Sequence, residues 1–131
     1  MGKTSNKVGL TKLELRIMQV IWRCGRCTVS DVQGELEPPL AYTTVQTMLN
    51  VLHRKGRVKR RLKDRAYFYQ PVLSRQKAVM QAVGDMLDRF FGGSADGLVL
   101  SLVETRRLTP EKLARIQKLL APSREDKHGN D

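Results

Sequence analysis

At 131 residues and 40% hydrophobic composition, the chain can bury one core and little more. Its 24 basic and 13 acidic residues give a formal net charge of +11, which favours a polyanionic partner. No apolar run approaches the roughly 20 residues of a membrane span. The polar start from Met1 to Gly9 also lacks the apolar centre of a signal peptide. We therefore expect a cytoplasmic protein without a membrane partner.

Two helix starts carry capping signals early in the chain. Thr11 and Glu14 have the spacing of a capping box ahead of an apolar run with helical period. Thr28 is placed to cap a second, shorter helix, with Asp31 at its third position. The prolines of residues 37–39 then end this helix, so the predicted order is helix, turn, helix, loop.

Cys24 and Cys27 form a CxxC pair in the turn between these helices. Such a pair can be a redox centre or half of a zinc site. Zinc needs about four ligands, and only His53 and His128 could add to the two thiols. His128 lies in a polar tail, so we expect no metal site. A thioredoxin-like pair would follow a strand in a βαβ unit, which this pattern does not predict. We interpret the cysteines as small residues flanking a turn.

The most informative segment is a third helix over residues 42–56. Its apolar positions recur at i, i+3, i+4 and i+7, and Thr43 is expected to cap it and Gly56 to end it. The opposite face carries short hydrogen-bonding side chains, which suits a DNA major groove, although an ordinary solvated face has the same composition. The candidate base contacts are Thr43, Gln46, Thr47 and Asn50.

A dense basic segment follows directly. Residues 54–65 hold eight basic side chains and one acid, Asp64. Charges at this density repel one another unless a polyanion is present. The aromatic residues 67–69 come next, so we expect the segment to pack against the fold and not to be a flexible tail. The candidate phosphate contacts are Tyr42, Thr44, Arg54, Lys55, Lys59, Arg61, Lys63 and Arg65.

The basic segment also has the pattern of a β-hairpin. Residues 58–62 and 66–70 alternate as two short strands around a turn at 63–65. Three helices followed by a basic hairpin make a winged helix-turn-helix domain, here over residues 1–73. The predicted fold class is therefore mainly α with a small β-hairpin wing.

Helical periodicity returns after Pro71. Ser74 is expected to cap one helix, Gly92 and Gly93 to end it, and Thr109-Pro110 to start the last one. Residues 74–121 form the predicted helical dimerisation domain, and residues 122–131 a disordered tail. The alternative is that these helices cover the winged domain, but they carry more apolar surface than so small a fold absorbs. The candidate dimer contacts are Val79, Val83, Met86, Leu87, Phe90, Phe91, Leu98, Leu102, Leu113, Ile116 and Leu120.

With these elements placed, residues 9–121 resemble the BlaI/MecI family of penicillinase repressors. The resemblance implies a homodimeric repressor on a palindromic operator, commonly with a TACA/TGTA-type core, whose C-terminal helices interlock between the two subunits. Its carriers are Leu13-Glu14-Leu15-Arg16-Ile17-Met18, Trp22, Thr28-Val29-Ser30-Asp31-Val32, Tyr42-Thr43-Thr44-Val45, Leu49, Leu52, Lys55-Gly56 and Tyr69-Gln70-Pro71.

The chain departs from that family at two points. In the β-lactamase-linked members a sensor-triggered protease cuts an Asn-Phe bond in the fifth helix, and Ser101-Leu102 stand there in this chain. The copper-responsive relatives carry a C-terminal cysteine cluster, whereas this chain has no cysteine after Cys27. The sequence therefore predicts neither copper sensing through that cluster nor the identity of an inactivating protease or an inducing signal.

The leading interpretation is a sequence-specific transcriptional repressor that binds double-stranded DNA as a homodimer. One alternative is a winged-helix module that binds proteins, which leaves the basic segment without a role. The other is a redox-responsive regulator that switches through Cys24 and Cys27. No metal-ligand cluster, Gly-rich phosphate loop or His beside a nucleophile is present in the sequence, so we expect no enzyme and no cofactor.

Overall fold

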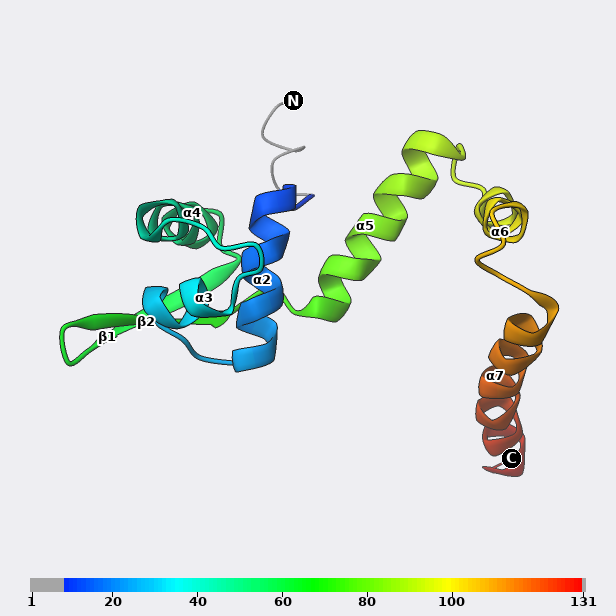
Figure 1. Ribbon diagram of the computed structural model, residues 1–131. Coiled ribbons are helices and arrows are strands. Elements are labelled where there is room, and N and C mark those ends of the chain that lie inside the picture. The colour runs from blue at the N-terminus through cyan, green and yellow to red at the C-terminus, as the bar shows by residue number, and fades with distance from the viewer. Residues whose placement is uncertain (1–8, 131) are drawn as a thin grey trace. The chain divides into compact units, whose positions relative to one another are not determined.

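The computed structural model describes residues 9–130, with side chains as far as residue 121 (Figure 1). One compact unit ends at Asp85 and a second begins at Met86, within helix α5. The elements are α2 (Lys12–Cys24), α3 (Val29–Glu35), α4 (Tyr42–Arg54), β1 (Val58–Lys63), β2 (Ala66–Pro71), α5 (Arg75–Phe90), α6 (Ala95–Glu104) and α7 (Pro110–Asn130).

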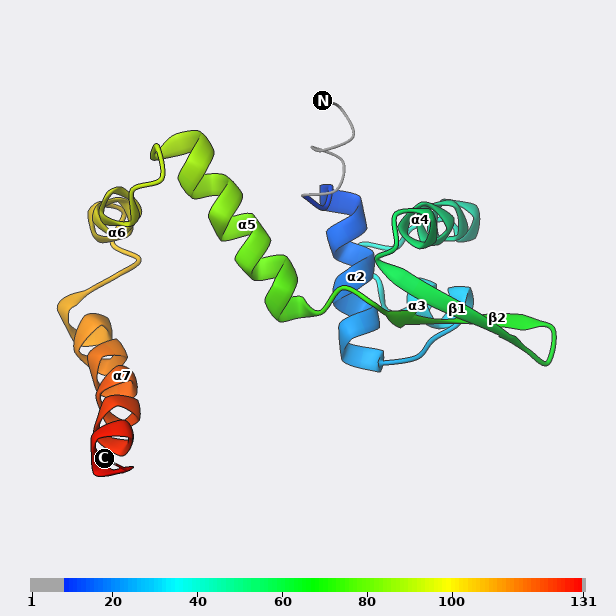
Figure 2. The same ribbon diagram turned by 180° about the vertical axis from the view of Figure 1, so that it is seen from behind.

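The predicted fold class is confirmed. Helices α2, α3 and α4 precede a two-stranded antiparallel sheet of β1 and β2, which is the order of a winged helix-turn-helix. In both views the hairpin extends beyond the three helices, with its turn at the far end (Figures 1 and 2). None of the helices in the described part of the chain has the length and apolar character needed to cross a bilayer.

Both early capping predictions are confirmed. Thr11 Oγ1 accepts a hydrogen bond from the Glu14 amide at 3.1 Å, and the Thr11 amide donates to Glu14 Oε1 at 2.9 Å. Thr28 and Asp31 make the same reciprocal pair at the start of α3, at 3.1 and 3.0 Å. Each box satisfies two amides that an uncapped helix would leave without partners.

The predicted cap of α4 is wrong. This helix begins at Tyr42, with Ala41 as its extended N-cap residue and no side-chain cap. Thr43 is therefore already inside the first turn. The prolines of residues 38–39 favour an extended chain before the helix, and the Leu40 carbonyl accepts a hydrogen bond from Gln33 Nε2 at 3.1 Å. These restraints bring the chain into α4 ahead of Thr43.

One cluster of apolar residues joins α2, α3, α4 and the base of the hairpin. The inner face of α4 is fully buried at Val45, Leu49 and Leu52, as its periodicity predicts. A fully buried side chain of this size contributes about 1.5–3 kcal/mol. The cluster consists of Ile17, Met18, Val20, Ile21, Cys27, Val29, Val32, Leu36, Val45, Leu49, Leu52, Val58 and Tyr69.

Each strand of the hairpin ends one residue later than predicted. The register places Arg60 opposite Tyr69 and Arg61 opposite Phe68. The two-residue turn has positive φ at Asp64 (52°) and Arg65 (69°), as in the type I′ turns that match the twist of a hairpin. The hairpin therefore carries its basic side chains on a short, tightly closed ribbon.

Cys27 attaches the hairpin to the helices. Its amide donates to the Tyr69 carbonyl at 3.0 Å, and the Tyr69 amide donates to the Cys27 carbonyl at 2.7 Å. Both side chains are buried in the core. The turn between α2 and α3 thus adds one antiparallel bridge to β2, which holds the base of the wing.

A buried acid links the start of α2 to the end of α4. Glu14 is 1% exposed, and its Oε2 lies 2.8 Å from Lys55 Nζ. Burial raises the pKa of the Glu14 carboxyl, but hydrogen bonds from Lys55 and Thr11 outweigh it, so the pKa lies below its ordinary value. The pair stabilises the folded state while Glu14 is ionised.

The expected helix ends of the C-terminal half are also present. Ser74 Oγ accepts from the Lys77 amide at 3.1 Å at the start of α5. Gly92 and Gly93 follow this helix with φ of 55° and 84°. Pro110 is the first residue of α7, whose backbone is helical as far as Asn130, beyond the predicted limit at 121. The domain boundary at 73/74 and the disorder of residues 122–131 stay predictions.

Glu14→Gln should destabilise the fold on the order of 2 kcal/mol at pH 7, because Lys55 would lose its ionised partner. Since the folded-state pKa of Glu14 is lowered, this stabilisation is present above the unfolded-state pKa. It is lost as the pH falls through the folded-state pKa. Urea unfolding at several pH values measures both effects, and the difference between wild type and variant should shrink from pH 6 to pH 3.

Glu35→Gln is the matched control. Glu35 pairs with Arg23 at 3.5 Å, but both side chains are more than half exposed. Its loss should cost less than about 0.5 kcal/mol. Equal costs for the two substitutions would contradict a structural role for the Glu14–Lys55 pair.

Candidate nucleic-acid interface

The outer face of α4 is polar and open to solvent. Thr43, Gln46, Thr47 and Asn50 are all exposed, on the side away from buried Val45, Leu49 and Leu52. Hydroxyl, methyl and amide groups on such a face match the donors, acceptors and thymine methyls at base edges of a major groove. The structure therefore places the predicted base contacts on one accessible surface, while contact with DNA stays a prediction.

Most of the predicted phosphate contacts are also exposed. Lys59, Arg61 and Lys63 share one face of the hairpin, opposite Gln70, Phe68 and Ala66, and Arg65 is in the turn. Arg54 is exposed at the end of α4, and Tyr42 at its start is 44% exposed. These side chains, all but Tyr42 cationic, come from the same compact unit as the α4 face.

Two of the predicted phosphate-contacting residues, Lys55 and Thr44, are less accessible to a ligand. Lys55 donates to buried Glu14 and keeps 29% of its side-chain exposure. Thr44 is only partly exposed on α4. Both can still approach a ligand through their accessible atoms, but Lys55 has a structural contact that the count of basic residues does not reveal.

The contacts of Arg60 were not predicted from the sequence. Its Nη1 donates to Asn50 Oδ1 at 3.0 Å, and its Cζ lies 4.4 Å from the centre of the Tyr67 ring. Strand alternation placed Arg60 on the same face as Val58, which is buried, and this was the available signal that it points toward the helices. Only the register and the approach of α4 bring Asn50 within reach.

A hollow of about 280 Å³ lies beside this surface, between α3, the start of α4 and the hairpin. Ser30, Tyr42 and Arg65 are among the residues that line it. It adjoins the predicted DNA-facing residues Tyr42 and Gln46, so the polar surface continues from α4 onto the wing.

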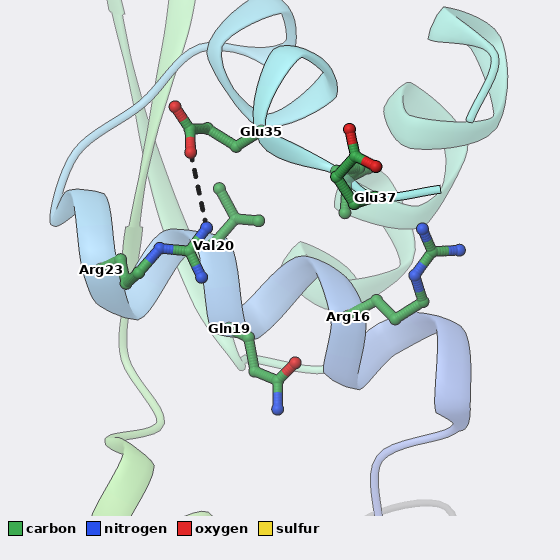
Figure 3. A pocket seen from close by; sticks show the side chains of 7 residues that line it. Arg16, Gln19, Val20, Arg23, Glu35 and Glu37 are labelled. Carbon is green, nitrogen blue, oxygen red and sulfur yellow. Dashed lines mark ion pairs between the residues drawn. The ribbon is translucent and has the colours of Figure 1, made fainter. Parts of the chain in front are cut away.

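A second hollow, of about 310 Å³, lies between α2 and the end of α3 (Figure 3). It contains both charge signs: Arg23 pairs with Glu35 across it, and Arg16 donates to the Pro38 carbonyl. None of the predicted DNA-contacting residues lines it. Its mixed charges give it no evident preference for an anion or a cation.

The chain matches a known protein family over nearly all of its described length. The profile of the family described as penicillinase repressor matches residues 10–122. The chain belongs to the penicillinase repressor family. Repressors are regulatory proteins, so membership in this family means that the chain is not an enzyme.

Two individual penicillinase repressors show the extent of the similarity. The chain is 26% identical to that of Bacillus licheniformis over 113 residues, which covers 85% of this chain and 88% of the relative. It is 20% identical to that of Staphylococcus aureus over 118 residues, with coverages of 88% and 94%. The similarity thus extends over both compact units in each case.

A solved structure of a multiple antibiotic resistance repressor, MarR, is also similar. Its TM-score is 0.49 at 18% identity, covering 92% of this chain and 81% of that chain.

Neither cysteine of this family member is part of a disulfide or a metal cluster. Both thiols are free, and no group of three or more His, Cys, Asp or Glu side chains within the described residues could hold a metal ion. Cys24 is exposed, whereas Cys27 is fully buried. Burial, with a smaller effect of Cys24, raises the pKa of the Cys27 thiol to about 12. A thiol with such a pKa is almost entirely protonated at neutral pH and is a poor partner for thiol exchange.

Iodoacetamide at pH 7.5 should therefore alkylate Cys24 in the native protein and leave Cys27 unmodified, whereas both should react in urea. Intact-mass and peptide-mass measurements distinguish the two sites. Native Cys27 reacting as fast as Cys24 would contradict a structural role and favour the redox alternative.

Proposed function

We propose that this protein is a transcriptional repressor that binds a palindromic operator in double-stranded DNA as a cytoplasmic homodimer. The observation that carries the proposal is one compact unit in which an exposed polar helix face adjoins a strongly basic hairpin. A repressor of this family needs base readout and attraction to the phosphate backbone, and these two surfaces offer one each.

Helix α4 is the proposed reading element. Its inner face is buried in the core, so the outer face is held in a definite orientation. Thr43, Thr47 and Asn50 would enter the major groove, with Gln46 at the flank. An amide side chain can pair with an adenine edge, and threonine methyls can contact thymine methyls.

The start of α4 and the hairpin wing would bind the phosphate backbone of the DNA. No side chain caps α4, so the amides of its first turn are open to a phosphate beside Tyr42. Lys59, Arg61, Lys63 and Arg65 would contact phosphates along the wing. Such contacts give affinity and position but carry no sequence information directly.

The apolar surface of the C-terminal helices supports a homodimer. Neither α5 nor α6 contains a buried residue. Along α5, Val79, Val83, Met86 and Phe90 are all more than 40% exposed, with Phe90 at 72%. Leu113, Ile116 and Leu120 are exposed on α7, while Leu87, Phe91, Leu98 and Leu102 are partly exposed.

A second copy of the chain is the proposed occupant of this surface. The spacing of the exposed α5 residues approximates a heptad, which favours packing against a like helix. A two-fold dimer presents two copies of α4, and two-fold symmetric readers match palindromic half-sites. Exposed apolar surface on this scale would otherwise favour aggregation.

Two alternatives have weaker support. A protein-binding winged module would leave the basic wing unexplained, and its affinity for DNA would be low and independent of sequence. A redox regulator would need a reactive pair, and the buried, protonated Cys27 opposes it.

Thr47→Ala and Arg61→Ala should separate readout from backbone binding. Thr47→Ala should weaken binding to operator DNA by about 1–3 kcal/mol and leave random DNA nearly unchanged. Arg61→Ala should weaken both and reduce the salt slope by about one unit. Fluorescence anisotropy over a salt series, after circular dichroism has shown both variants folded, measures the two effects. Equal losses on both DNAs for Thr47→Ala would exclude α4 as the reader.

Phe90→Glu should dissociate the dimer, because two charges would enter an apolar contact. Operator affinity should fall about 100-fold, since the second half-site would no longer bind as part of one complex. Analytical ultracentrifugation at micromolar concentration and anisotropy measure these changes. Gln81→Glu is the matched control, because it adds the same charge at an exposed position on the far side of α5. A wild-type protein that sediments as a monomer would remove the dimer from the proposal.

A further inference from the structure

Arg60 differs from every other basic residue of the hairpin in its surroundings. It belongs to the face of β1 that contains buried Val58, whereas Lys59 and Arg61 occupy the exposed opposite face. Arg60 is itself only partly exposed. A side chain selected for phosphate contact alone gains nothing from this inward position, so its contacts require another explanation.

The Arg60 guanidinium joins the reading helix to the wing. Its Nη1 donates to Asn50 Oδ1 at 3.0 Å, and its Cζ lies 4.4 Å from the Tyr67 ring centre. Tyr67 is in turn 6.4 Å from the Tyr69 ring, tilted by 55°. Tyr69 is 2% exposed and bridges to the Cys27 backbone. One continuous set of contacts therefore runs from the outer face of α4 to the core.

The chemistry of arginine determines how Asn50 is oriented. A guanidinium has five N–H donors and no acceptor, so the Asn50 carbonyl oxygen, and not its amide nitrogen, faces Arg60. The Asn50 NH₂ group is then left to donate away from the wing. Guanine O6 and N7, adenine N7 and thymine O4 accept such a bond in the major groove, whereas the cytosine amino group does not.

We propose that Arg60 is a positioning residue for base readout: it holds the Asn50 amide with its donor side outward and fixes the wing against α4. This role rests on the proposed function and adds a specificity determinant to it. The planar guanidinium donates to Asn50 and also lies over the Tyr67 ring, and a lysine ammonium cannot reproduce this pair of contacts. Arg60 therefore acts on specificity through Asn50, without touching a base.

The test uses the full-length protein and two DNA duplexes. One duplex is recovered from a random library by in vitro selection with the wild-type protein, and the other is a shuffled sequence of the same composition. Arg60→Lys keeps the positive charge but removes the planar guanidinium, which donates to Asn50 and lies over the Tyr67 ring. Arg23→Lys is the matched control, because it makes the same change at an exposed position of α2 that lies outside the predicted DNA contacts.

Arg60→Lys should lower affinity for the selected duplex about tenfold and leave the shuffled duplex and the salt slope unchanged. Arg23→Lys should change the affinity for neither duplex by more than about twofold. Arg60→Ala and Asn50→Ala should be non-additive on the selected duplex, because each removes the same contact. In the DNA-free protein, the Asn50 side-chain amide signal in a ¹⁵N spectrum should shift in Arg60→Lys and stay in place in Arg23→Lys.

Other results would overturn the proposal. Equal losses on both duplexes with a shallower salt slope would make Arg60 a phosphate contact. Additive losses, or an Asn50 amide signal that does not respond to Arg60→Lys, would remove the coupling between the two residues while leaving the repressor function intact. A wild-type protein that binds both duplexes equally would overturn the proposed function and this role together. Thermal unfolding of each variant identifies misfolding, in which case Tyr67→Leu tests the same network from its other end.

Discussion

The orientation of α4 depends on the burial of its inner face and on an ion pair at its C-terminal end. Its inner face is buried at Val45, Leu49 and Leu52, and its end is tied to the first helix by the pair between Lys55 and Glu14. Burying a carboxylate is costly unless it is paired and hydrogen-bonded, and the cap at Thr11 supplies the remaining contact. Glu14 therefore completes the capping box at the start of α2 and, through Lys55, also helps to place α4.

This constraint explains how a chain with so much positive charge folds compactly. The cationic groups near α4 have different surroundings: Lys55 is paired with a buried acid, Arg60 lies over an aromatic ring, and Arg61 is exposed to solvent. Solvation and pairing reduce the mutual repulsion of these groups in the DNA-free state. The exposed charges remain available for a phosphate backbone, so stability and binding are divided among different residues of one short segment.

The two units differ in what they bury. The first has a core to which every element of the winged domain contributes, whereas α5 and α6 contain no buried residue. A homodimer would give the C-terminal helices the core that one chain lacks, and would set the spacing of two α4 helices on DNA. Under this proposal, specificity would depend on both the side chains of α4 and the geometry of dimerisation.

Much of the secondary structure follows from interactions between residues that are close together in the sequence. Capping boxes, proline and glycine positions and the i, i+3, i+4 period predict most helices and the inner face of α4, because each depends on neighbours along the chain. Thr43 was misassigned as a cap because α4 begins at Tyr42, after a chain segment that Gln33 of α3 contacts at Leu40. Tertiary structure alone decided that Lys55 pairs with Glu14, that Cys27 bridges to Tyr69 and that Arg60 reaches Asn50. These contacts join residues 10 to 42 positions apart, and periodicity along one element carries no information about the distance between two elements.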